Sequence, residues 1–376
     1  MRDSLYLAWH YVCHHRFTTL SLICSITLIA YLPAALEVIV NNAEEHFRAR
    51  ASSTPLLVGA KGSQLELVLS CLYFDGVYDD TLSMKYFQQI EEQKLGLSIP
   101  IHAKFKTDEF TVVGTTSDYA IHQNLQLAQG SHANMMGECV VGSHVAKELK
   151  LHIGSKLPVS SSPAFLLTSP KLRLKVVGIL FQTETPDDNA ILVDLKTTWI
   201  MEGLGHGHVK SAPHGSANAA NYTDITKENV NSFHFHGDES DFPITSILVV
   251  PSSQKNETLL LGQYFSADQP AQIVRPQEVM DSLLEKVFMV RSYIVAIIAV
   301  VSMVTLLTIS LVIVLSIRLR QAELSMMKKI GCSRFTIAMN LGCQILIILS
   351  ASVVGVVCLT LVTDLYGREL IRLLIL

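Results

Sequence analysis

The stretch FTTLSLICSITLIAYLPAALEVIV, residues Phe17–Val40, decides the structural class of this protein. This apolar run is longer than the roughly 20 residues that an α-helix needs to cross about 30 Å of hydrocarbon. Two similar runs follow much later in the chain, at Tyr293–Ile317 and Phe335–Val362. A long and mostly polar segment separates them from the first. The sequence therefore predicts a membrane protein with three transmembrane helices and one large insert outside the bilayer.

Basic residues predict the orientation of these helices, because short loops rich in Lys and Arg stay on the cytoplasmic side. Arg2 and Arg16 lie near the start of the chain. The loop between the second and third runs carries one acid, Glu323, and five basic residues: Arg318, Arg320, Lys328, Lys329 and Arg334. Both segments are expected inside. We expect the first run to remain as an anchor, because it is too long for a signal core and no small-residue cleavage pattern follows it.

The chain is expected to begin with a cytoplasmic N-terminus and the first helix (residues 1–40), followed by an extracytoplasmic α+β domain (41–288). The second helix (289–317), a cytoplasmic loop (318–335), the third helix (336–362) and a short outer tail (363–376) are expected to follow. The tail is too short to cross the bilayer again and is expected to lie along its outer surface. A formal net charge of −4 argues against a nucleic-acid partner.

The insert combines the periodicities of strands and helices. Strands are expected at Leu56–Gly59, Glu109–Gly114, Glu138–Gly142, Leu172–Gln182, Ala190–Leu195 and Ile244–Val250. Helices are expected at Leu65–Leu72, Thr81–Lys94, Ser143–Leu149 and Lys255–Tyr264. Ser143 is expected to be the N-cap of its helix. Residues 203–241 are rich in Gly, Asn, Ser and His, and are expected to be a mobile loop.

Helical spacing also continues out of two of the membrane runs. The first run continues through Arg48, and Pro276–Val290 leads directly into the second run. We expect these segments to be two stalk helices that transmit movement between membrane and insert.

Catalytic motifs are not found. The chain lacks the phosphate-binding pattern G-x-x-x-x-G-K-[ST], a nucleophile elbow and an H-E-x-x-H helix. We therefore expect a non-catalytic membrane subunit with no intrinsic cofactor. Cys71 and Cys139, the two cysteines of the insert, could form a disulfide or be two buried thiols, and their spacing does not decide between these alternatives.

The loop between the second and third runs can form a short amphipathic helix. Leu324, Met327 and Ile330 recur at helical spacing before Gly331, and Ser333 is positioned to cap the next helix. Such a helix could dock into a groove of a cytoplasmic partner. An ordinary basic loop that only determines topology is the alternative.

Histidines form a second group of candidate site residues. Five of the chain's 14 histidines lie close together in the predicted outer loop: His206, His208, His214, His234 and His236. Imidazole is a ligand for zinc and other transition metals, and Asp238 and Asp241 could add oxygen ligands. Their spacing matches no closed zinc motif, so a solvated polar loop rich in histidine is the alternative.

The inner loop also resembles a known family. RQAELSMMKKIGCSR, residues Arg320–Arg334, is similar to the coupling segment R-x-x-E-[IL]-x-x-L-[RK]-x-[IL]-G-[AC]-[ST]-[RK] of FtsX/MacB/LolC-type ABC transporter permeases. ECVVGSHVAKEL (Glu138–Leu149), followed by IGSKL (Ile153–Leu157), resembles part of a MacB-type extracytoplasmic domain, and LKVVGIL (Leu174–Leu180) and DDNAILV (Asp187–Val193) resemble the strands that follow. VGAKGSQLELVLS, Val58–Ser70, is similar to a narrower group of uncharacterised MacB-like permeases.

The resemblance implies a permease that dimerises, as a homodimer or with a paired permease, and binds a cytoplasmic ABC ATPase. ATP-driven closure then moves the outer domains, a process called mechanotransmission, in the bacterial inner membrane. By the same resemblance, the stalks at Glu44–Arg50 and Glu278–Val287 would be the levers. The resemblance assigns the ATPase contact to six residues: Arg320, Glu323, Met327, Ile330, Gly331 and Arg334. A periplasmic adaptor or lipoprotein is a further expected partner, besides membrane lipid.

Two features keep other functions open. Family members usually have four spans and this chain offers three, so either its subgroup uses three or the chain lacks a natural end. An FtsX-like scaffold that regulates a periplasmic partner without transport has the same layout as a permease that exports or extracts a substrate. A membrane-anchored binding protein without an ATPase is the third reading, and it predicts that the inner loop tolerates mutation.

Overall fold

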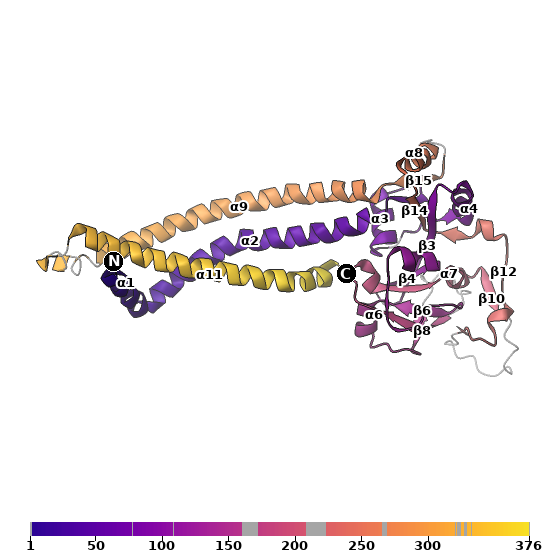
Figure 1. The fold of residues 1–376 in the computed structure, drawn as a ribbon, viewed down its shortest axis with the longest axis horizontal. Helices are drawn as coiled ribbons and strands as arrows, with labels where there is room; N and C mark the ends of the chain where they lie inside the picture. Colours follow the sequence, from indigo (N-terminus) through magenta and orange to yellow (C-terminus); the bar gives the residue numbers. More distant parts are fainter. Residues whose placement is uncertain are drawn as a thin grey trace. The chain divides into compact units, whose positions relative to one another are not determined.

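The computed structural model describes residues 2–76, 78–107, 109–159, 172–207, 223–264, 269–319, 321, 325–326, 329–331 and 333–375 (Figure 1). The chain divides into two compact units. The helical unit comprises Met1–Glu45 and Leu284–Ile375, and the α+β unit comprises His46–Leu283.

In its described residues, the α+β unit is built on a mixed sheet of 11 strands. Nine of them follow one another in space: β11 (Thr223–Asp224), β8 (Leu172–Leu180), β6 (Glu138–Val141), β9 (Ala190–Asp194), β4 (Phe110–Thr115), β3 (Gly96–Thr107), β14 (Ser246–Pro251), β1 (Leu56–Ala60) and β15 (Ala271–Val274). The other two also pair with β8: β5 (Leu127–Gly130) and β7 (Lys156–Val159). Strands β4 and β9 run parallel, whereas β3 pairs with β4 and β14 in antiparallel fashion.

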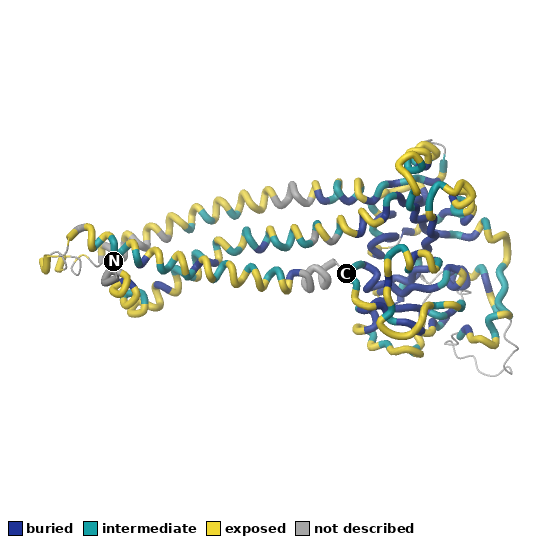
Figure 2. Tube along the Cα trace, viewed as in Figure 1, coloured by how far each residue is buried: buried dark blue, intermediate teal, exposed yellow. Residues whose placement is uncertain are grey.

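Apolar side chains cover both faces of this sheet. In β9, Ile191 packs in one hydrophobic cluster and Leu192 packs in another, and in β4 the neighbours Val112 and Val113 divide in the same way. Successive side chains of a strand point to opposite faces, so a strand buried on both sides needs a continuous apolar run. Figure 2 shows these central strands as buried.

The two cysteines of the α+β unit belong to different clusters. Cys71 lies in the cluster with Leu192, and Cys139 lies in the cluster with Ile191. Both are free thiols with no exposed surface, and burial raises the pKa of each. The structure therefore favours two buried thiols over a disulfide.

Helices and 3-10 turns complete the α+β unit: α3 (Gln64–Leu72), α4 (Met84–Gln93), α5 (Ser117–His122), α6 (Ser143–Glu148), α7 (Leu195–Met201), α8 (Gln254–Gln263), η1 (Pro186–Asn189), η2 (Val230–Ser232) and η3 (Glu239–Asp241). The strands and helices expected from the sequence are present, with shifted ends. Two short pairs of strands stand apart from the sheet: β10 (Gly205–Gly207) with β12 (Phe233–Phe235), and β2 (Leu82–Ser83) with β13 (Pro243–Ile244).

Three sequence expectations about this unit need correction. Ser143 is not an N-cap: Gly142 holds that position, and the Ser143 hydroxyl donates to Asp188 Oδ1 at 2.9 Å. The predicted loop at 203–241 contains β10 and β12, because glycine and histidine can form strands when aromatic residues pack beneath them. The long strand β3 was missed, since its lysines and histidine interrupt the apolar pattern of GLSIPIHAKFKT.

Among the described residues, the long helices of the helical unit are α1 (Arg2–His14), α2 (Arg16–Ser52), α9 (Pro276–Leu319) and α11 (Arg334–Ile375). Within this unit α1 packs against α11, and α2 meets α11 through polar contacts. Tyr31 and Thr363 share a hydrogen bond of 2.7 Å between their hydroxyls, and Asn42 donates to Asp364 Oδ1 at 3.1 Å. Residues 363–375, expected as a separate outer tail, instead continue α11 without a break.

Two helical segments among the described residues are long and apolar enough to cross a membrane, Arg16–Ser52 and Phe335–Gly367. A shorter apolar stretch, Ser292–Thr308, lies in α9, where several side chains of the predicted second span fall outside the described residues. Most of these apolar side chains are exposed in the chain by itself (Figure 2). Exposed apolar surface on this scale calls for a lipid or protein neighbour.

Two positions of strand β3 test the buried face of the sheet. Ile99 has no exposed surface, whereas Leu97 in the same strand is 42% exposed. We expect Ile99→Ala to lower the free energy of unfolding by about 2–5 kcal/mol, because it leaves a cavity, and Leu97→Ala to cost much less. Denaturant unfolding of the detergent-solubilised chain, followed by the fluorescence of buried Trp199, measures both. Equal losses would contradict this packing.

Candidate functional site

Helix α2 ends in a charged side chain buried within the α+β unit. Arg50 lies in the last turn of the helix and is only 4% exposed. Its Nε donates to the carbonyl of Leu72 at 3.1 Å, and its Nη2 donates to the Tyr119 hydroxyl at 2.5 Å. Its Nη1 lies 3.0 Å from Asp187 Oδ2. The guanidinium therefore joins the end of α2 to α3, α5 and η1.

Asp187 completes this group from the η1 turn. The Tyr119 hydroxyl donates to its Oδ1 at 2.6 Å, and the Thr185 hydroxyl donates to its Oδ2 at 3.0 Å. Asp188, the next residue, accepts the backbone N–H of Glu184 at 2.8 Å and so holds the turn that presents Asp187. We call Arg50, Tyr119 and Asp187 the stalk anchor.

Burial makes the stalk anchor sensitive to the loss of any partner. Burial by itself opposes the charged form of Arg50 and is the largest single influence, but the Asp187 carboxylate together with Tyr119 and Tyr73 outweighs it, so the pKa of Arg50 lies above its usual value. Burial also raises the pKa of Tyr119 well above 10, so its hydroxyl keeps its proton and can donate. Removing one member of a buried ion pair leaves the other charge uncompensated in an apolar interior.

The first turns of α9 are tied to the same unit. Met280 has no exposed surface, and Arg275 just before the helix pairs with Glu257 and Glu278, each at 2.9 Å. Arg48 Nε lies 3.0 Å from Asp281 Oδ1, which links α2 to α9. Both of these side chains are nearly half exposed, so this ion pair contributes much less than the buried one.

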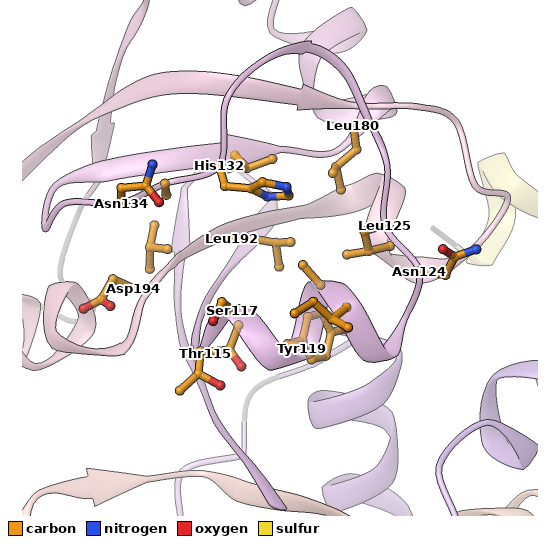
Figure 3. A pocket seen from close by; sticks show the side chains of 16 residues that line it. Thr115, Ser117, Tyr119, Asn124, Leu125, His132, Asn134, Leu180, Leu192 and Asp194 are labelled. Atoms are coloured by element: carbon orange, nitrogen blue, oxygen red, sulfur yellow. The ribbon is translucent and has the colours of Figure 1, made fainter. Parts of the chain in front are cut away.

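A pocket of about 680 Å³ lies beside the stalk anchor. Val140, Leu180 and Leu192 supply apolar lining, and Tyr119 forms part of the wall. Figure 3 shows Leu192 and Leu125 between the loop that carries His132 and the helix that carries Tyr119. Pockets of this size and mixed lining accept small molecules or the side chains of a partner.

One edge of the pocket carries an acid. Asp194 lines the pocket and also caps α7, accepting the backbone N–H of Lys196 at 2.9 Å. Burial raises the pKa of this carboxyl. The other polar residues of the lining include Ser117, His132 and Asn134.

The structure places only part of the predicted coupling segment. Arg320, Glu323 and Met327 lie outside the described residues, as does the side chain of Arg334. Ile330 is 81% exposed, and its N–H bonds to the Met326 carbonyl at 3.0 Å, as in a helical turn.

The end of this turn and the start of the next helix are both defined. Gly331 has a φ of 97°, a left-handed conformation that favours glycine at a helix C-terminus. The Ser333 hydroxyl accepts the N–H of Thr336 at 3.1 Å and caps α11, as expected from the sequence. An exposed apolar side chain therefore stands where one helical turn ends and α11 begins.

Three of the five predicted metal-ligating histidines come together. Nitrogen atoms of His206, His234 and His236 all lie within 4.8 Å of one another. His208 and His214 lie outside the described residues. The Asp238 carboxylate caps η3, where it accepts the N–H of Ser240 at 3.0 Å.

Comparison with known proteins identifies the family. A family model described as the MacB-like periplasmic core domain matches residues 18–226. The chain belongs to this family. It is an ABC transporter permease with a MacB-like periplasmic core domain. Permeases of this family are membrane components of ABC transporters, and they work with a cytoplasmic ABC ATPase that lies in a separate subunit.

Solved structures similar to this permease were also found, and no curated protein matches its sequence. The periplasmic region of MacB from Actinobacillus actinomycetemcomitans is 10% identical, with a TM-score of 0.38, and the match covers 62% of this chain and 94% of that one. The extracellular domain of YknZ from Gram-positive bacteria is 11% identical, with a TM-score of 0.34 and coverages of 58% and 98%. A domain of a putative permease from Porphyromonas gingivalis is 10% identical, with a TM-score of 0.28 and coverages of 59% and 89%.

The stalk anchor was not predicted from the sequence. Asp187 was used only as part of a family resemblance, and Arg50 only as the end of a lever. A buried arginine and a buried aspartate so far apart in sequence have no common motif. The one local signal is the polar turn TETPDDN before an apolar strand. It places two aspartates next to the core, where a buried carboxylate needs a cation or hydrogen-bond donors.

Substitutions in α2 test the stalk anchor. We expect Arg50→Met to lower the free energy of unfolding of the permease by about 3–5 kcal/mol, because Asp187 is left buried without its cation. The double variant Arg50→Met, Asp187→Asn should regain part of the lost free energy of unfolding, because no uncompensated charge is then buried. Arg48→Met, two residues earlier in the helix, should cost less than about 1 kcal/mol. Denaturant unfolding followed by Trp199 fluorescence measures all three, and similar costs for both arginines would contradict the assignment.

Proposed function

We propose that this chain is the permease subunit of an ABC transporter in which a separate cytoplasmic ATPase drives movement of the extracytoplasmic α+β unit. The observation that carries the proposal is the buried attachment of α2 through the stalk anchor. A helix that ended in a flexible linker could not transmit its movement to the α+β unit. A helix whose last turn holds a buried ion pair passes movement on to the core.

Helix continuity supports this mechanism. Helices α2 and α9 each belong to both units, so each carries an unbroken backbone between them. From Val40, the end of the predicted span, to Arg50 the helix rises about 15 Å. An α-helix is stiff over this length, so displacement or rotation in the membrane reaches Arg50. Met280 and the ion pairs of Arg275 hold the first turns of α9 to the same core.

The pocket offers a way to use this movement. Tyr119 belongs both to the stalk anchor and to the pocket wall. A displacement of Arg50 would therefore move the wall against which an extracytoplasmic substrate or partner binds. Such coupling needs no path through the bilayer, which agrees with a permease that exports or extracts a substrate already outside.

We assign the three membrane spans to Phe17–Val40, Tyr293–Ile317 and Phe335–Val362, in the bacterial inner membrane with the α+β unit in the periplasm. The permease acts as a homodimer or with a paired permease, and a periplasmic adaptor or lipoprotein is its outer partner. The exposed apolar side chains of α2, α9 and α11 support this assignment, because a lipid surrounding removes them from water.

The ATPase contact is assigned to the inner loop, with Ile330 as its apolar centre. The other proposed contact residues flank it in the sequence: Arg320, Glu323, Met327, Gly331 and Arg334. An apolar side chain that is 81% exposed at the end of a helical turn is suited to enter a groove of another protein. The flanking arginines would pair with acids around that groove.

Ile330→Asp tests the ATPase contact. We expect this variant to insert and fold normally but to recover less than about a tenth of the wild-type ATPase subunit, because a charge must then be desolvated at the interface. The measurement is quantitative mass spectrometry of proteins co-purified from native membranes. Ile153→Asp makes the same change in the α+β unit, at a side chain that is 46% exposed, and should leave ATPase recovery unchanged. Equal recovery with both variants would contradict the assignment.

A further inference from the structure

The short pair of strands β10 and β12 is built to present imidazoles on one face. The strands run antiparallel, with Gly205 opposite Phe235, His206 opposite His234, and Gly207 opposite Phe233. Successive side chains alternate between the two faces of a strand. His206 and His234 therefore share one face, and the phenylalanines lie on the other.

The glycines explain why the phenylalanines fit. A Cβ atom on Gly205 would lie 2.8 Å from the Phe235 ring, and one on Gly207 would lie 2.7 Å from the Phe233 ring. Both distances are too short for a real contact, so only glycine lets these rings lie across β10. The pattern Gly-His-Gly opposite Phe-His-Phe thus separates an aromatic face from an imidazole face.

His236 adds the third imidazole to that face. It follows His234 by two residues, and its backbone N–H donates to the Leu204 carbonyl at 3.0 Å, which extends the pairing beyond β12. The ring centroids lie 4.6 Å apart for His206 and His234, 4.8 Å for His206 and His236, and 4.7 Å for His234 and His236. Each ring is therefore next to both others.

The aromatic face attaches the strands to the core. The Phe235 ring lies 6.3 Å from Trp199 and 5.9 Å from Phe242, measured between ring centroids. Trp199 is 1% exposed, and its Nε1 donates to the Pro243 carbonyl at 2.8 Å. The imidazole face is therefore attached to the buried core, and such packing lowers the conformational cost of binding a ligand there.

We propose that His206, His234 and His236 bind one divalent transition-metal ion of the zinc type, through three imidazole nitrogens. Tetrahedral zinc at its usual Zn–N distances holds nitrogens about 3.3 Å apart. The three nitrogens, all within 4.8 Å of one another, reach this spacing by small side-chain rotations, for which the exposed His206 and His236 have room. Imidazole is a borderline ligand that suits Zn²⁺, Cu²⁺, Ni²⁺ and Co²⁺ better than Mg²⁺ or Ca²⁺.

Two features make the proposed site an exchangeable one. His206 and His236 are exposed, so an ion can enter from water. Three protein ligands leave one tetrahedral position for water or an external ligand, unlike a closed structural zinc site. An ion bound there would also join β10 to β12 and steady Phe235 against Trp199. The site is independent of the proposed function, because it requires neither an ATPase nor movement of the stalk helices.

Metal binding by the full-length permease tests the proposal. The protein is purified in detergent with a tag free of histidine, and Zn²⁺ is titrated in competition with a chromophoric chelator. The triple variant His206→Asn, His234→Asn, His236→Asn should lose at least 100-fold in affinity for one ion per chain. The control His122→Asn, His132→Asn, His152→Asn removes the same number of histidines from the α+β unit and should stay within threefold of wild type.

Two further measurements keep the test decisive. The thermal unfolding midpoint in EDTA should be the same for the triple variant and wild type, which excludes misfolding as the cause of lost binding. Electron paramagnetic resonance of the Cu²⁺-loaded wild type should show hyperfine coupling to three nitrogens. Unchanged Zn²⁺ affinity in the triple variant, or an equal loss in a His208→Asn, His214→Asn variant alone, would overturn the proposal.

Discussion

The buried pair of Arg50 and Asp187 is the constraint on which the attachment of α2 to the core of the α+β unit depends. It places a positive charge from the last turn of α2 against a carboxylate of η1, with the Tyr119 hydroxyl between them. Both charges are out of water, so neither can move without the other at acceptable cost. Helix α2 is therefore attached to the core by an interaction that resists separation, and the neighbouring pocket shares its tyrosine.

The stalk anchor and the histidine face of β10 and β12 are both held in place by the α+β unit, but through different interactions. The stalk anchor is held by buried charge, whereas the histidine face is held by aromatic packing behind an exposed surface. In both, contacts with the buried core orient the polar groups. The first fixes the end of a helix in the core, and the second leaves the imidazoles of His206 and His236 open to solvent.

Local patterns explain why much of the fold could be predicted. Val112 and Val113, or Ile191 and Leu192, form continuous apolar runs because both faces of the sheet are covered, and Ser333 caps α11 through a local hydrogen bond. The predictions were wrong where contacts between residues distant in the sequence determine the local structure. Ser143 gives its hydroxyl to Asp188 instead of capping a helix, and β12 forms inside a predicted loop because Trp199 and Phe242 receive Phe235.

The sequence by itself determined the membrane class, the strand and helix pattern of the insert and the similarity of Arg320–Arg334 to a coupling segment, because these follow from the order of neighbouring residues. It also showed that histidines are concentrated in one segment. Only the tertiary structure decided which of them meet, since His206 faces His234 through strand pairing. Only the tertiary structure also showed that Arg50 pairs with Asp187. The attraction between two charges depends on their distance in space and on their burial, and the separation of two residues in the sequence predicts neither.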